Sequence, residues 1–282
     1  MSLDANDNSP PPPGGPASRL LGDFGKVLRF YSRLPMPVFA FEANPHAMPD
    51  FSRATWAIPV AGAVIGACGA LVGLGAYLAG LSTGLAATLT IAALVIVTGA
   101  FHEDGLADSC DGLWGGATRE RRLDIMKDSR IGTYGAMGLA LALALRIFPL
   151  MELFRLLGPM ALLLVIGIGA ASRPLALLPV LLLPPAQGTG LAASVPMPRT
   201  GSLALAVAGG LALLTMAGFF VDLVPGLAVS LAMLSVVLGL AVHIARTKIG
   251  GHTGDILGAC QQLSEITLLI GLSAAANWQG PQ

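Results

Sequence analysis

Hydrophobic residues in this chain gather in long stretches separated by short polar segments. After residue 55, seven of these stretches are apolar on every face. A transmembrane helix needs about 20 largely apolar residues, whereas membrane β-strands alternate apolar and polar positions. The pattern therefore predicts an all-α, polytopic integral membrane helical bundle with about seven transmembrane helices. The predicted spans are residues 56–80, 84–101, 132–150, 158–183, 202–221, 226–245 and 256–274.

The fourth predicted span is interrupted by Arg173 and Pro174. Proline removes a helical hydrogen bond, and an arginine in lipid is costly. Two interpretations are open, one broken helix or two shorter pieces. Two complete spans would reverse the orientation of every later helix.

The segment before the spans has two parts. Residues 1–18 are acidic and rich in proline, and they lack the apolar core of a signal peptide, so they predict a disordered tail. In residues 19–34, apolar side chains recur at helical spacing and basic ones lie off that stripe. This pattern predicts an amphipathic helix, either on the membrane surface or packed against the rest of the protein. Residues 19–282 are predicted to form one membrane-embedded domain.

Composition supports the membrane class. The chain is 54% hydrophobic and 11% charged, and its mean hydropathy is +0.74. A soluble domain carries about 25% charged residues. The formal net charge is zero, so bulk charge predicts no nucleic-acid partner. The three cysteines show no spacing of a disulfide framework or zinc site, which agrees with a reducing, cytoplasm-facing setting. The sequence leaves the oligomeric state open.

Basic residues divide unevenly between the two sides of a seven-span bundle. One side holds those of the N-terminal region, of segment 119–130 and of segment 246–248, whereas the other keeps little beyond Arg146 and Arg155. Lys and Arg concentrate on the cytoplasmic side of membrane proteins. Segment 102–131 is therefore predicted to be a cytoplasmic loop of a multi-pass protein in the bacterial inner membrane.

That loop contains a row of acids in the sequence FHEDGLADSCDGLWGG, residues 101–116. If the segment is helical, the spacing places Asp104, Asp108 and Asp111 on one face, and Glu103 elsewhere. Clustered carboxylates repel one another unless a cation or protons neutralise them. Oxygen-only ligands suit Mg²⁺ or Mn²⁺, which bridge to substrate phosphates. The row predicts a metal site formed by these three aspartates, in preference to a solvated acidic loop.

Further polar residues follow the acidic row. Lys127, Asp128 and Arg130 precede the third span, and acids for a metal beside bases for phosphate are typical of phosphoryl transfer. The alternative is that they are ordinary cytoplasmic charges and surface ion pairs.

A second polar island interrupts the apolar C-terminal part. GGHTGD opens a helix there, and backbone amides at a helix start bind phosphate. Asp255 and Glu265 lie at or inside the last span, where acids are usually functional. The alternative is a tight loop with Asp255 as helix cap and Glu265 paired to Arg173. His102 and His252 are placed to reach a substrate from their loops.

Three motifs, in order along residues 20–274, resemble those of the cobalamin synthase (adenosylcobinamide-GDP ribazoletransferase) family. They are RFYSRLP at 29–35, HEDGLAD at 102–108 with Asp111-Gly112 and MKDSRIGTYG at 126–135, and GGHTGDILGA at 250–259. The resemblance implies a membrane-embedded, magnesium-dependent transferase domain over residues 19–282. It would join adenosylcobinamide-GDP to α-ribazole or its 5′-phosphate, and release GMP with adenosylcobalamin or its phosphate.

The resemblance also suggests roles for individual residues. Asp104, Asp108 and Asp111 would hold magnesium against the diphosphate, and Asp111 or Asp128 would accept the hydroxyl proton. The expected substrate-binding residues are Arg33, His102, Lys127, Arg130, Arg173, Gly250, Gly251, His252, Thr253, Gly254, Asp255 and Glu265.

The sequence fits other classes of membrane protein less well. A CDP-alcohol phosphotransferase also uses aspartates at the membrane edge, but its pattern continues to an Ala-Arg pair, whereas Ala107 here precedes Asp108. A cation-coupled transporter would use Asp255, Glu265 and Arg173, but most acids cluster in one loop. A purely structural membrane protein leaves the acidic row unexplained.

Overall fold

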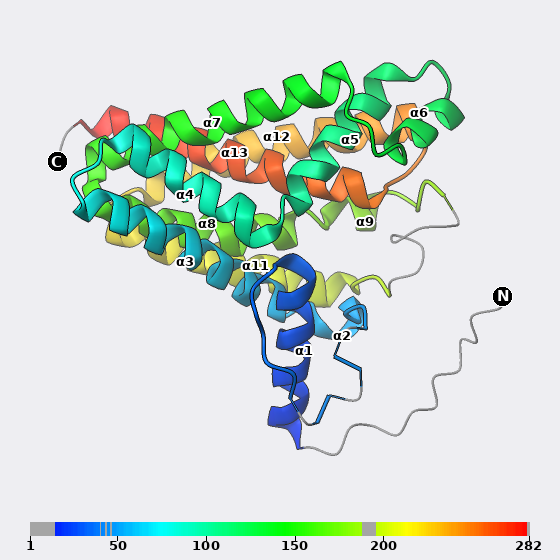
Figure 1. Ribbon diagram of the computed structural model, residues 1–282, viewed down its shortest axis with the longest axis horizontal. Helices are drawn as coiled ribbons and strands as arrows, with labels where there is room; N and C mark the ends of the chain where they lie inside the picture. Colours follow the sequence, from blue (N-terminus) through cyan, green and yellow to red (C-terminus); the bar gives the residue numbers. More distant parts are fainter. Residues whose placement is uncertain (1–14, 40, 43, 46, 188–195, 281–282) are drawn as a thin grey trace.

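The computed structural model describes residues 15–39, 41–42, 44–45, 47–187 and 196–280. Long helices run side by side in a bundle, and the only β-pairing in the described part is an isolated bridge between Pro185 and His252 (Figure 1). The all-α prediction is confirmed. The helices are α1 (Pro16–Tyr31), α2 (Phe51–Ala54), α3 (Ala57–Leu78), α4 (Thr83–Thr98), α5 (Phe101–Gly115), α6 (Arg119–Met126), α7 (Thr133–Leu157), the 3₁₀ turn η1 (Gly158–Met160), α8 (Ala161–Leu175), α9 (Leu178–Leu182), α11 (Thr200–Phe220), α12 (Val224–Ile249) and α13 (Gly254–Gln279).

Several helices are long and apolar enough to cross a membrane. Among the described residues there are five such segments, or six if the bent pair α4 and α5 counts as one broken span. One of the five runs from Thr133 to Leu182. A straight helix would separate its Arg146 and Ser172 by roughly 39 Å, yet both side chains contact one network on α13. The segment therefore folds back at η1 into two arms, α7 and α8.

Two predicted spans differ from the structure, each because a helix breaks. The fourth predicted span is one arm with a broken end, because α8 ends just after Pro174 and α9 has only five residues. The second predicted span ends early, because Gly99 and Ala100 both have left-handed backbone conformations. The chain turns by 89° there into α5. The segment predicted as a loop, 102–131, is therefore mainly the two helices α5 and α6.

The N-terminal helix α1 begins at Pro16, within the segment predicted to be a disordered tail. The rest of that prediction, residues 1–14, lies outside the described residues. Figure 1 shows α1 standing across the long axis of the bundle. It packs on α2 and α3 and buries Val27, Leu28 and Tyr31. Leu20 on the same helix stays half exposed.

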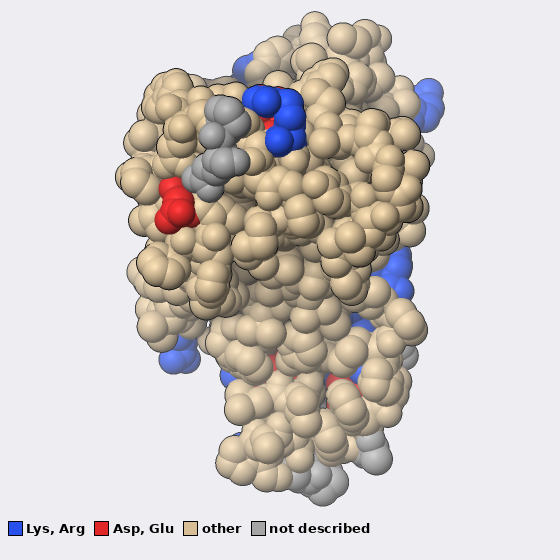
Figure 2. All heavy atoms as spheres, turned by 90° about the vertical axis from the view of Figure 1, so that its left-hand side faces the viewer, with Lys and Arg blue, Asp and Glu red and all other residues tan. Residues whose placement is uncertain are grey.

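The two ends of the bundle differ in charge. Figure 2 looks onto the end that carries the C-terminus, and this end shows few Lys, Arg, Asp or Glu side chains. Helices α5 and α6, with the acidic row and the basic segment 119–130, lie at the opposite end (Figure 1). This distribution agrees with the uneven division of basic residues read from the sequence.

Small residues let α3 and α8 pack backbone against backbone. A Cβ added to Gly62 would collide with the carbonyl oxygen of Gly169, and one added to Gly66 would lie 2.9 Å from Ile166 Cα. Such close contact between helices is typical of glycine-rich membrane interfaces, where dispersion replaces the hydrophobic effect. Helix α8 of this pair also packs on α13, and α13 in turn packs on the acidic helix α5.

Replacing Gly62 with valine should therefore destabilise the fold. We expect a loss of about 1–3 kcal/mol because the two backbones must separate, seen as a lower melting temperature of the detergent-purified protein. Gly75→Val on the same helix is the control, because no atom lies within 4 Å of a Cβ built there. Equal melting temperatures for the two variants would contradict the packing argument.

Candidate active site

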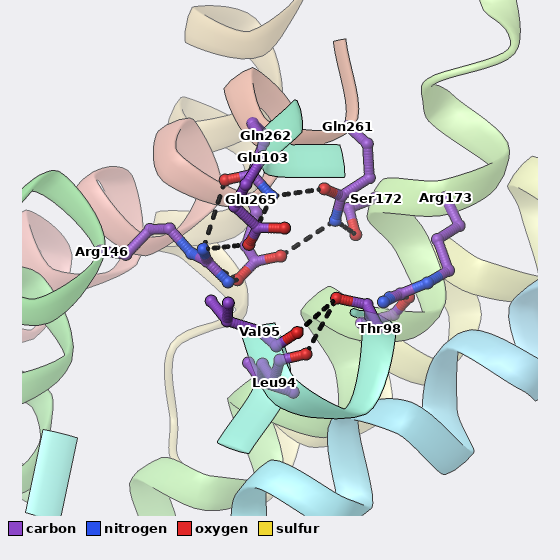
Figure 3. Close-up of polar contacts among 11 residues, drawn as sticks. Leu94, Val95, Thr98, Glu103, Arg146, Ser172, Arg173, Gln261, Gln262 and Glu265 are labelled. Atoms are coloured by element: carbon purple, nitrogen blue, oxygen red, sulfur yellow. Dashed lines mark hydrogen bonds and ion pairs between the residues drawn. The ribbon is translucent and has the colours of Figure 1, made fainter. Parts of the chain in front are cut away.

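A buried ion-pair network joins α5, α7 and α13 (Figure 3). The Arg146 side chain is 2% exposed, and its guanidinium lies 2.7 Å from Glu103 Oε1 and 2.8 Å from Glu265 Oε1. Gln261 Nε2 donates to Glu265 Oε2 at 2.9 Å and to Ser172 Oγ at 3.1 Å. The sequence had assigned Arg146 to the far side of the membrane. It lies instead inside the bundle.

Arg173 lies next to this network but does not pair directly with Glu265. Its Nη1 donates to the carbonyl oxygen of Gly169 at 2.9 Å. The Nε of Arg173 and the Oε2 of Glu103 are buried and have no hydrogen-bond partner among the described residues. Both side chains, together with His102, line a small internal cavity. The alternative that Glu265 is paired to Arg173 is therefore wrong, because Arg146 takes that position.

A cluster of carboxylates forms where α5 meets the start of α13. Asp104 is exposed, and Asp108 and Asp255 are half-buried. The charged neighbours that act most on Asp108 are Asp104, Asp255 and Asp111, all negative. The prediction that the acidic row is helical, with Glu103 pointing elsewhere, is confirmed. The addition of Asp255 from a distant motif was not foreseen.

Two glycines allow α5 and α13 to approach this closely. A Cβ on Gly105 would lie 3.0 Å from the carbonyl oxygen of Asp255, and one on Gly258 would lie 3.3 Å from Gly105 Cα. The HEDGLAD and GGHTGDILGA motifs therefore touch through their glycines. This contact brings the carboxylate of Asp255 to those of α5.

Asp111 lies on the same face of α5, as the spacing predicted, but unlike the other acids its carboxylate is already bound by backbone groups. It is buried, and its two oxygens accept hydrogen bonds from the backbone N–H groups of Gly132 at 2.7 Å and Gly135 at 2.8 Å. These donors lie at the start of α7, which has no intrahelical acceptor for them. Asp111 therefore fixes the RIGTYG segment against α5. The described residues donate no hydrogen bond to the carboxylate of Asp104 or Asp108.

The oxygen donors of this cluster suit magnesium only in an open site. Within the described ranges, no group of three or more His, Cys, Asp or Glu side chains is placed to hold a metal ion. Magnesium, however, is commonly held by one or two carboxylates together with waters and substrate phosphates. Asp104, Asp108 and Asp255 supply oxygen atoms only and lie in a strongly negative region. The site fits an ion shared with a phosphate, not a closed protein cage.

The basic residues after α6 are paired or exposed. Arg130 Nη2 lies 2.6 Å from Asp128 Oδ2, and this hydrogen-bonded pair lowers the pKa of Asp128 to about 2. Lys127 is exposed at the end of α6. No hydrogen bond in the described part links these three residues to Asp104 or Asp108, so the structure does not bring the predicted phosphate-binding bases into direct contact with the acids.

The GGHTGD segment is fixed by backbone hydrogen bonds to residues 184–186 and by a helix cap. Gly250 ends α12 with φ of +74°. His252 exchanges backbone hydrogen bonds with Pro184 and Ala186, and Gly251 packs against the same strand-like segment. Thr253 caps α13 by accepting from the N–H of Ile256 at 3.2 Å. Two residues of this predicted phosphate-binding segment lie toward the rest of the site. Gly254 lines the pocket beside the carboxylates, and Asp255 has Asp104 as a charged neighbour.

An aromatic pocket lies beside the carboxylates. The rings of Tyr31 and His102 stack with centroids 5.7 Å apart, and Arg173 and Gly254 also line the pocket. Arg33 lies over the break between α4 and α5, where its backbone N–H donates to Val97 at 2.7 Å. Three further aromatic residues complete this pocket, namely Phe30, Phe51 and Phe101. Sequence reasoning missed it, although aromatic residues border two of the three motifs.

These features define a polytopic helical membrane protein with a carboxylate site and an aromatic pocket at one end of its bundle. A model of the family described as "Cobalamin-5-phosphate synthase" matches residues 23–273. The chain belongs to this family, and the resemblance inferred from the three motifs is confirmed.

Curated relatives agree with the family match. The chain is 42% identical over 260 residues to the adenosylcobinamide-GDP ribazoletransferase of Azorhizobium caulinodans, covering 90% of this chain and 96% of that protein. The proteins of the same name from Xanthobacter autotrophicus and Brucella ovis are 45% and 40% identical, over 90% and 91% of this chain and 96% and 98% of their own lengths. No solved structure matches this chain.

Breaking the buried network should be costly. Arg146→Met leaves two buried carboxylates without their cation, so we expect a loss of about 3–5 kcal/mol, measured as the melting temperature in detergent. Adding Glu103→Gln and Glu265→Gln removes the uncompensated charges and should restore much of the loss. Arg155→Met on the same helix is the control, because its ion pair with Glu152 is exposed and worth little. A triple variant no more stable than Arg146→Met would contradict this account.

Proposed function

We propose that this protein is an adenosylcobinamide-GDP ribazoletransferase. It would join adenosylcobinamide-GDP to α-ribazole or its 5′-phosphate, giving adenosylcobalamin or its 5′-phosphate and GMP. The names of the curated relatives support this activity. The structural observation that carries the proposal is the juxtaposition of Asp104, Asp108 and Asp255 with the aromatic pocket, because a diphosphate and a flat base need these two surroundings.

The reaction is a substitution at phosphorus. The hydroxyl oxygen of the ribazole forms a bond to the phosphorus that stays with the cobinamide. The bond from that phosphorus to the bridging oxygen breaks, and GMP leaves with the electron pair. The hydroxyl proton passes to a carboxylate. Such reactions depend mainly on positioning and on neutralising charge.

The carboxylate cluster supplies the charge-bearing part of the site. Asp104 and Asp255 would hold magnesium together with the diphosphate, whose charge the ion offsets, and Asp108 lies beside them. Without a cation, three carboxylates would repel a substrate with the same sign of charge. The same acids therefore make the site selective for a substrate that arrives with a metal.

Asp108 is the proton acceptor that the geometry favours. Both oxygens of Asp111 already accept backbone N–H groups. Asp128 has a pKa of about 2, and a carboxylate that acidic is a weak base at neutral pH. Asp108 is half-buried, and no described residue donates a hydrogen bond to it. Asp128 then acts by holding Arg130, which contacts phosphate from outside the cluster.

The aromatic pocket would take the flat base of a substrate. Aromatic side chains stack on bases whatever their hydrogen-bonding pattern, and Tyr31 and Phe101 border the pocket with His102. Arg173 at the inner end offers a cation to a phosphate. The pocket meets α13 at Gly254 and Gly258, next to Asp255, so a base bound there would lie beside the carboxylates.

The bundle orientation follows from its charges. The end with α5 and α6 carries the basic segment 119–130 and the basic end of α12, and the other end is poor in charge. By the positive-inside rule, the carboxylate site faces the cytoplasm of the bacterial inner membrane. Nucleotide substrates are available on that side.

GMP release tests the activity and the metal site together. Protein in nanodiscs should release GMP from adenosylcobinamide-GDP only when α-ribazole phosphate and Mg²⁺ are both present. Asp104→Asn should lower this rate roughly 100-fold or more while the protein stays folded, because one electrostatic contact to the transition state is lost. Asp124→Asn, an exposed acid on α6, should keep wild-type activity. Magnesium-independent turnover, or full activity in Asp104→Asn, would refute the metal assignment.

The pH dependence of kcat separates the two candidate bases. Asp108→Asn should lower kcat by about 10²–10⁴-fold and remove the acidic limb of the profile, because the proton acceptor is gone. Asp128→Asn should leave the shape of the profile unchanged and raise KM, because Arg130 loses its partner. Loss of the acidic limb in Asp128→Asn would instead assign the base to Asp128.

A further inference from the structure

An apolar groove lies behind the acidic helix. It is formed between α5 and α12, which both pack extensively on α13 but touch each other at few points. The groove has a volume of about 280 Å³, and its lining is almost wholly apolar. Its wall residues include Leu106 and Leu113 of α5, Leu240 and Ala241 of α12, and Ala259 and Leu263 of α13.

Helix α5 has two opposite faces at this groove. With about 100° per residue, Asp104 and Asp108 lie on one side of the helix. Leu106, Ser109 and Leu113 lie on the other side and line the groove. The face that covers the groove is therefore the back of the face that carries the catalytic carboxylates. Whatever fills the groove supports the acidic helix from behind.

The groove opens onto a surface that faces lipid. Helix α12 is long and apolar enough to cross the membrane, and its Val236 and Leu240 side chains are more than half exposed. Leu240 is also part of the groove. Trp114 lines the groove, and Lys248 Nζ lies 4.4 Å from its ring centroid. Aromatic and basic residues of this kind mark the membrane interface. The groove therefore extends from the interface toward the acyl-chain region.

One polar atom points to an ester-bearing occupant. Ser109 is 3% exposed and lines this apolar groove, but its hydroxyl has no hydrogen-bond partner among the described residues. A buried hydroxyl without a partner is costly. The ester carbonyl of a phospholipid lies at the level of the interface and accepts such a hydrogen bond. Lys248, whose Nζ donates to the carbonyl oxygen of Leu113, and Arg122, which donates to that of Lys248, lie at the same end and bring positive charge to an anionic headgroup.

We propose that a phospholipid acyl chain occupies this groove, with its ester against Ser109 and its phosphate toward Lys248 and Arg122. The lipid completes the packing of α5 on the side away from the carboxylates. This gives a physical reason for a nucleotide-processing site to be embedded in a membrane. The binding site itself does not depend on the proposed reaction.

Bound lipid is detectable through Trp114. In a Trp56→Phe, Trp278→Phe background Trp114 is the single tryptophan of the chain. Titrating phosphatidylglycerol with brominated acyl chains into the detergent-purified protein should quench its fluorescence in a saturable manner. Ala241→Phe fills the groove and should abolish the saturable phase. Ala232→Phe, at an exposed position on the same helix, should leave it intact.

Three outcomes would overturn the proposal. Quenching that never saturates would mean that Trp114 only samples the surrounding micelle. Equal saturable quenching in Ala241→Phe and Ala232→Phe would place the lipid elsewhere. A change in Trp114 emission with protein concentration, without lipid, would assign the groove to a second copy of the chain. The readout needs no turnover, so failure here is distinguishable from failure of the proposed reaction.

Discussion

The rest of the site depends on the buried pairing of Arg146 with Glu103 and Glu265. Charges without partners are very costly inside a bundle, so these three side chains must meet. Their meeting draws the first turn of α5 against α7 and α13. Because Glu103 points inward to Arg146, the next residue, Asp104, is turned toward solvent. The ion pair thus sets the rotation of the acidic helix as well as its position.

The three sequence motifs converge once α5 is held there. Gly105 meets α13 and brings Asp255 to the acidic row, and Asp111 secures the start of α7. The N-terminal motif closes the aromatic pocket over the break at Gly99. Carboxylates that repel one another are therefore held together by contacts made on the other sides of their helices. A site built in this way suits a substrate that arrives with a divalent cation.

Local patterns in the sequence predicted the apolar arms and the helical acidic row, because these depend on runs and spacings within one segment. They did not predict the position of Arg146, since a charge near the end of a span is assigned to a loop unless its partners are known. They did not predict the turn at Gly99 and Ala100 either, because it directly follows a continuous apolar run. The approach of Asp255 to Asp108 depends on two helices far apart in the chain. The aromatic pocket depends in the same way on α1 meeting α5.

Manganese binding followed by electron paramagnetic resonance tests the central claim most directly. The account predicts that Mn²⁺ binds tightly only when adenosylcobinamide-GDP is present, with phosphorus hyperfine coupling from the diphosphate. It also predicts that Asp104→Asn, Asp108→Asn and Asp255→Asn each weaken this binding, whereas Asp124→Asn does not. Wild-type Mn²⁺ affinity in the Asp255→Asn variant, or tight binding without the substrate, would contradict a metal shared between the α5–α13 carboxylates and a diphosphate.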